Sequence, residues 1–131
     1  MPGNEAKLNF YLTNYTALSS LVSAVRGIQY FGGNTNTTGG LRLTRTEIFN
    51  TANGDRRRVP NVIVLITDGV PTREVGELWN EVRRVKNAGI RIVAVGITNA
   101  VSRACFQNCY FMHIQITLCI LFCGLVTIAI S

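Results

Sequence analysis

The chain has very few of the side chains on which nucleophilic catalysis depends. Its 131 residues include a single histidine, His113, and no cysteine precedes Cys105. A histidine base beside a serine or cysteine nucleophile is the usual core of an acyl-transfer or hydrolytic site. Because the first 104 residues contain neither histidine nor cysteine, the sequence predicts that the protein is not an enzyme.

The four cysteines do not form a recognisable metal or disulfide pattern. They lie at two C-x-x-x-C spacings, whereas common zinc sites use C-x-x-C with further ligands, and His113 alone cannot complete such a site. The body of the chain indicates no disulfide framework because it lacks cysteine. We interpret the four as small apolar residues of a hydrophobic tail: Cys105, Cys109, Cys119 and Cys123.

Basic residues outnumber acidic ones by 13 to 7, but they are scattered along the chain. Their one run, Arg56-Arg57-Arg58, has no interleaved aromatic residues, so we expect no nucleic-acid partner. We expect no secretory signal peptide at residues 1–5, because this segment is polar and no apolar run follows it.

Charged residues are absent from residue 104 to residue 131. Residues 114–130 are mostly Ile, Leu, Val, Phe and Cys, which approaches the ~17–25 residues that span a bilayer as a helix. We therefore predict a hydrophobic tail at 102–131, with a transmembrane helix at about 112–130. Two other interpretations stay open: translated non-coding sequence after a splice or gene-model error, or an apolar helix lying over an exposed sheet.

The body of the chain, 1–101, has the pattern of an α/β domain. Residues 62–67 and 90–97 are apolar runs typical of strands covered on both faces of a parallel sheet. Residues 74–88 between them have helical spacing, so the three segments predict a parallel βαβ unit. Before them we expect an edge strand at 6–12, a helix at 17–27, a glycine-rich loop at 30–40 and a helix at 41–50. This order indicates a doubly wound sheet.

Two motifs carry a family likeness. The loop Gly33-Asn34-Thr35-Asn36-Thr37 and the strand end Thr67-Asp68-Gly69 occur in the order found in von Willebrand factor type A (VWA) domains, which residues 4–100 resemble. The sequence pattern is most similar to that of the A domains of collagen type VI and matrilins. The resemblance implies a Rossmann-like sheet, an adhesion or extracellular-matrix role, a collagen-like protein ligand, and an extracellular or membrane location.

The resemblance also implies a divalent cation, usually Mg²⁺, at one end of the sheet. It places Thr35 in the second of three metal loops and Asp68 in the third. Mg²⁺ prefers oxygen ligands of this kind, and an open coordination position could take a partner's carboxylate. The first loop, D-x-S-x-S, does not occur in this sequence. We therefore expect an N-terminally truncated VWA domain that lacks its first central strand and has an incomplete metal site.

Two further short motifs and two alternative functions follow from the sequence. Asn14-Tyr15-Thr16 fits the N-glycosylation sequon, which matters only in a secreted chain. Thr37 we expect to be a helix N-cap rather than a metal ligand. The alternatives to a matrix-binding module are a tail-anchored single-pass membrane protein that reaches the membrane through residues 112–130 with a vestigial VWA portion, and a non-functional truncated gene product.

Overall fold

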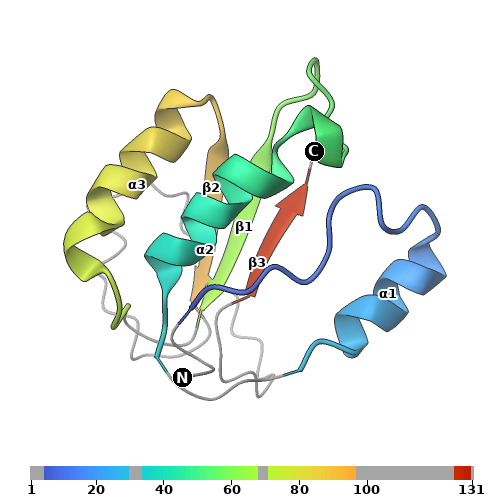
Figure 1. The fold of residues 1–131 in the computed structure, drawn as a ribbon, viewed down its shortest axis with the longest axis horizontal. Coiled ribbons are helices and arrows are strands. Elements are labelled where there is room, and N and C mark those ends of the chain that lie inside the picture. The colour runs from blue at the N-terminus through green and yellow to red at the C-terminus, as the bar shows by residue number, and fades with distance from the viewer. Residues whose placement is uncertain (1–4, 30–33, 68–70, 97–125, 131) are drawn as a thin grey trace.

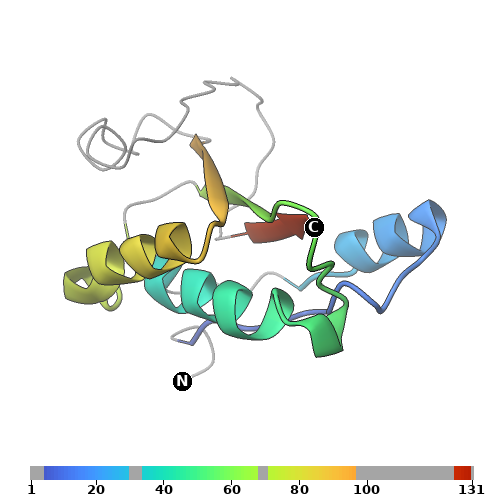
Figure 2. The same cartoon turned by 90° about the horizontal axis from the view of Figure 1, so that it is seen from above.

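The computed structural model describes residues 5–29, 34–67, 71–96 and 126–130, and these form an α/β arrangement (Figure 1). The strands form one sheet, helices α2 and α3 lie against it, and α1 lies to one side (Figures 1 and 2). In chain order the elements are α1 (Leu18–Arg26), α2 (Thr37–Leu43), the π-helical turn η1 (Thr44–Ile48), the 3-10 turn η2 (Thr51–Asn53), β1 (Val62–Thr67), α3 (Val75–Asn87), β2 (Arg91–Gly96) and β3 (Val126–Ile130).

The parallel βαβ unit predicted from the sequence is confirmed. β1 and β2 pair in parallel, with a register that runs from Val62 opposite Arg91 to Thr67 opposite Gly96. α3 connects the two strands and ends before Gly89, which has φ +77°, a conformation that glycine adopts without strain. The parallel arrangement brings the carboxyl ends of both strands to the same edge of the sheet, where α/β folds place their ligands.

The hydrophobic core lies between this sheet and two helices, α2 and α3, which cover the same face (Figure 2). β1 alternates along its length, because Ile63, Leu65 and Thr67 are buried while the residues between them are half-buried. The predicted coverage of both faces is therefore complete on one face of β1 and partial on the other. The fully buried positions are supplied by both layers: Leu41, Ile63, Leu65, Leu78, Val82, Val85, Ile90 and Ala94.

The end of the tail forms a strand. β3 pairs antiparallel with β1, from Ile66 opposite Val126 to Val62 opposite Ile130, which gives the sheet order β2-β1-β3. The predicted C-terminal helix was wrong for residues 126–130, and the rest of the predicted helix lies outside the described residues. Two physical reasons favour the strand: its sequence is rich in β-branched residues, and β1 offers it an otherwise unpaired edge. None of the described helices is long and apolar enough to cross a membrane.

The amino-terminal elements pack less closely than the sequence predicted. Residues 6–11 have no strand assignment, so the edge strand predicted at 6–12 was wrong, because none of the strands in the described part of the chain pairs with it. Helix α1 is confirmed within the predicted range 17–27, yet none of its residues is buried. Leu18, at the start of this helix, is 77% exposed.

Candidate functional site

Two loops meet where the metal site was predicted. The backbone N–H of Thr35 donates to the hydroxyl of Thr72 at 3.0 Å, and the backbone N–H of Thr72 donates to the carbonyl of Thr35 at 3.0 Å. The N–H of Arg73 donates to the same carbonyl at 3.3 Å. Three hydrogen bonds therefore hold the loop that contains Thr35 against the segment between β1 and α3.

The start of α2 follows this loop directly. Asn36 is the N-cap, since its side-chain oxygen accepts from the N–H of Gly39 at 2.7 Å. The expectation that Thr37 is the N-cap was therefore wrong, and residues 37–40, predicted as loop, are helical because this cap starts the helix early. The Thr37 hydroxyl is buried and has no hydrogen-bond partner among the described residues. A buried unpaired oxygen is costly, which makes it a candidate to meet a bound group.

Glu74 joins both loops to the helices. Its carboxylate accepts from the Asn36 side-chain amide at 3.3 Å and from the Arg42 guanidinium at 2.7 Å. Its backbone carbonyl accepts from the Thr38 hydroxyl at 3.0 Å. The hydrogen bonds from Arg42 and Asn36 hold the pKa of the Glu74 carboxyl below its usual value. Glu74 therefore carries a negative charge beside the predicted metal edge at neutral pH.

A second acidic residue, Glu81, lies deeper between α2, η1 and α3. Its side chain is fully buried and accepts from Arg45 Nε at 2.7 Å and from Arg84 Nη1 at 3.1 Å. Burial alone would raise the pKa of Glu81, but the hydrogen bonds and charges of these two arginines outweigh it and lower the pKa. This cluster ties the helix that follows the Thr35 loop to α3.

The two predicted metal-site residues differ in how far the structure describes them. Thr35 is half-buried and lies next to the segment that follows β1. Asp68 lies outside the described residues, one position after the end of β1 at Thr67. The described residues contain no group of three or more His, Cys, Asp or Glu side chains that could hold a metal ion. The pairing of Thr35 with Asp68 around a cation therefore stays a prediction.

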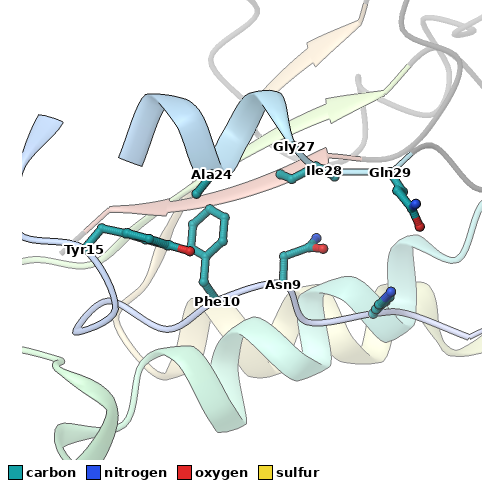
Figure 3. A pocket seen from close by; sticks show the side chains of 8 residues that line it. Asn9, Phe10, Tyr15, Ala24, Gly27, Ile28 and Gln29 are labelled. Atoms are coloured by element: carbon teal, nitrogen blue, oxygen red, sulfur yellow. The ribbon is translucent and has the colours of Figure 1, made fainter. Parts of the chain in front are cut away.

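A separate cavity of about 410 Å³ lies beside α1. It opens between the segment at 7–15 and the end of α1, where the Phe10 and Tyr15 rings meet edge to face at 5.4 Å between centroids (Figure 3). Asn9 and Gln29 add polar side chains to its lining. Asn14, the predicted glycosylation position, is exposed in the adjacent turn, and its modification stays a prediction.

A model of the von Willebrand factor type A domain matches residues 3–109. The chain belongs to the von Willebrand factor type A family. The resemblance seen in the sequence is thereby confirmed.

Related VWA proteins are much longer than this chain. It is 33% identical over 99 residues to the collagen alpha-1(XII) chain of Notophthalmus viridescens, which covers 76% of this chain and 10% of that protein. It is 32% identical over 98 residues to Homo sapiens vitrin, covering 75% and 14%, and 34% identical over 71 residues to Bos taurus cochlin, covering 54% and 13%. The chain thus spans a small part of each of these relatives.

The fold of the VWA domain is also found in a solved structure of proximal thread matrix protein 1 from the mussel byssus. The two share a TM-score of 0.74 at 20% sequence identity, over 82% of this chain and 28% of that one. A further structure of the mussel protein has zinc in its MIDAS motif, the metal-ion-dependent adhesion site. At this identity the comparison shows the fold alone.

Sequence reasoning missed the residues that fasten the VWA loops together. Thr72, Glu74 and Arg42 were not singled out, because their partners lie 32 to 38 positions away in the chain and no local pattern marks them. One signal was present: an acidic residue follows Pro71 and directly precedes an amphipathic helix, where helix caps and helix-dipole partners are common.

Proposed function

We propose that this VWA chain is a protein-binding module of the adhesion or extracellular-matrix type, which takes its ligand at the carboxyl edge of β1. Its natural setting is extracellular, as for its matrix-protein relatives, and its ligand is a collagen-like matrix protein. The binding domain occupies residues 1–101, and the apolar segment 102–131 contributes β3 (Val126–Ile130) to its sheet. The function is binding rather than catalysis.

The observation that carries the proposal is the double hydrogen bond between Thr35 and Thr72. These bonds hold Thr35, which the family resemblance assigns to a metal loop, against Thr72 in the segment before α3. The unpartnered hydroxyl of Thr37 lies two positions further along, at the start of α2. Hydroxyl oxygens are therefore concentrated at this edge, and hydroxyl and carboxylate groups are the donors that Mg²⁺ accepts.

The residues present fit a divalent cation only in part. Thr35 would hold it through its hydroxyl and Asp68 through its carboxylate, while the D-x-S-x-S residues that complete the family's site do not occur in the sequence. A bound Mg²⁺ would supply an open coordination position for a carboxylate of the ligand. With a single carboxylate at the site, the chain should bind the ion weakly, with a dissociation constant on the order of 10⁻³ M or above.

The proposal is tested by binding of the full chain to immobilised collagen. We expect binding in several millimolar Mg²⁺ and a several-fold loss of affinity when a chelator replaces the ion. Asp68→Ala and Thr35→Ala should reduce binding in Mg²⁺ to the level seen in chelator. Thr51→Ala is the matched control, since Thr51 is exposed in η2 and is not part of the edge.

Two outcomes would contradict the proposal. If the wild-type chain fails to bind collagen both in Mg²⁺ and in chelator, collagen is ruled out as the ligand. Binding that is equal in Mg²⁺ and chelator, and unchanged by Asp68→Ala, would move the ligand away from the edge of β1. Calorimetry with Mg²⁺ alone separates the two, because it measures uptake of the ion without any protein ligand.

A further inference from the structure

We propose that Glu74 is a positioning residue for the ligand edge, and that its side chain locks the Thr35 loop onto the segment that precedes α3. This role rests on the proposed function, because the edge it would organise is the one assigned there to the matrix ligand. Glu74 itself would touch neither ion nor ligand. It would act through Asn36 and Arg42.

The first argument is where the Glu74 side chain goes. Glu74 immediately precedes α3, where an acidic side chain commonly caps the first N–H groups of its own helix. Its side chain makes no such capping bond. It reaches α2 instead, accepting from Arg42 at 2.7 Å and from the N-cap residue Asn36 at 3.3 Å. The carboxylate thus connects two helices rather than completing one.

The second argument is the backbone of Glu74. It has φ 47° and ψ 33°, and it is the one residue other than glycine with positive φ in the described part of the chain. Left-handed geometry is unfavourable for a residue of this size, so the surroundings must hold it there. One restraint is visible in the bond from the Thr38 hydroxyl to the Glu74 carbonyl. Backbone strain of this kind is concentrated at active sites and ligand-binding sites, where it holds residues in position.

The third argument is that the contacts form a closed ring. Thr35 is bonded to Thr72 and Arg73, and its neighbour Asn36 is bonded to Glu74. Residues 35–36 are therefore held at both positions by residues 72–74. Loss of the Glu74 carboxylate would remove the bond at Asn36 from this ring and leave the bonds of Thr35 to Thr72 and Arg73 in place.

The test is amide hydrogen exchange of the full chain, which needs no ligand. Glu74→Gly removes the carboxylate and keeps the left-handed backbone accessible. We expect the amides of Thr35 and Thr72 to exchange several-fold faster than in the wild type, the effect expected for loss of an ion pair whose side chains are 42% and 40% exposed. The amide of Ile90, which donates to the Val85 carbonyl at 3.2 Å on the far end of α3, should keep its wild-type rate.

Two further variants distinguish positioning from a general structural role. Glu74→Gln retains a carbonyl oxygen that Asn36 can reach and should restore most of the protection at Thr35. Glu77→Gln, on the exposed side of the first turn of α3, should leave both amides unchanged. Uniform acceleration at Thr35, Thr72 and Ile90 in Glu74→Gly would overturn the positioning role, and so would wild-type exchange at all three.

The exchange result and the binding result are independent. If Glu74→Gly frees the Thr35 and Thr72 amides while the wild-type chain fails to bind collagen or Mg²⁺, the positioning role is supported and the proposed function is contradicted. If both hold, Glu74→Gly should also weaken binding to collagen in Mg²⁺ by several-fold.

Discussion

Arg45 Nε donates to Glu81 Oε1 at 2.7 Å, and the Glu81 side chain is completely shielded from solvent. The guanidinium of Arg84 approaches the other carboxylate oxygen at 3.1 Å, and Arg42 lies 3.9 Å from it. A buried carboxylate is tolerated only when it is paired in this way. The pairing therefore makes α3 and the helical segment before β1 depend on each other.

Replacing the buried acid should destabilise the fold. Glu81→Gln removes the charge that compensates Arg45 and Arg84, and loss of one partner from a buried ion pair commonly costs about 3–5 kcal/mol. Because the arginines are 26% and 52% exposed and can regain water, we expect about 2–3 kcal/mol here. Urea unfolding measures the change. Glu77→Gln, at an exposed position of the same helix, is the control and should stay within about 0.5 kcal/mol.

The same carboxylate predicts how stability depends on pH. The pKa of Glu81 is lowered in the folded state from a reference value of 4.5, so the unfolded chain binds a proton first as pH falls. The stabilisation from Glu81 should be complete above pH 4.5 and should be lost as pH falls below it, through the folded-state pKa. Unfolding free energies measured from pH 7 to pH 3 should therefore converge between wild type and Glu81→Gln. A constant difference across that range would contradict the assignment.

Two glycines should respond in opposite ways to alanine. A Cβ on Gly39 would lie 2.9 Å from the Asn36 side-chain nitrogen and 3.0 Å from Ala6 Cβ, so Gly39→Ala should displace the N-cap of α2 and cost about 1–3 kcal/mol. A Cβ on Gly76 would meet nothing within 4 Å, so Gly76→Ala in α3 should stabilise by about 0.5–1 kcal/mol. Thermal unfolding of the two variants beside the wild type checks both signs.

Leucines in different helices should differ sharply in their contribution to stability. Leu41 in α2 is 1% exposed within the core, and Leu41→Ala should cost about 2–5 kcal/mol through the cavity it leaves. Leu18 in α1 is 77% exposed, and Leu18→Ala should change stability by less than about 0.5 kcal/mol. A comparable loss in both variants, measured by urea unfolding, would show that α1 is packed into the core in solution.

Much of the central fold could be predicted from local sequence. The apolar run of β1, the spacing of Leu78, Val82 and Val85, and the glycine after α3 are local signals, and they gave the βαβ unit with boundaries within about two residues. The segments that failed depend on distant partners. Residues 6–12 have strand-like alternation but pair with no strand among the described residues. Residues 126–130 belong to a long apolar run that suggested a membrane helix, but they pair with the edge of β1.

The candidate site was predictable in outline only. Thr35 and Asp68 could be named from motifs that are contiguous in sequence, but the contacts that hold the Thr35 loop come from Thr72 and Glu74. Such contacts join positions more than thirty residues apart, and ordinary residue types make them. A single sequence does not identify the partners in these contacts, since threonine and glutamate in a loop are usually solvated.

The antiparallel pairing of β3 with β1 has a consequence for how the protein is made. Translation delivers β1, α3 and β2 well before β3, so the nascent sheet has an open apolar edge while the remaining residues are added. Non-local pairing of this kind is slow to form. Yield in a cell should therefore depend on elongation speed and on chaperones that shield the ribosome-bound chain until β3 can pair with β1.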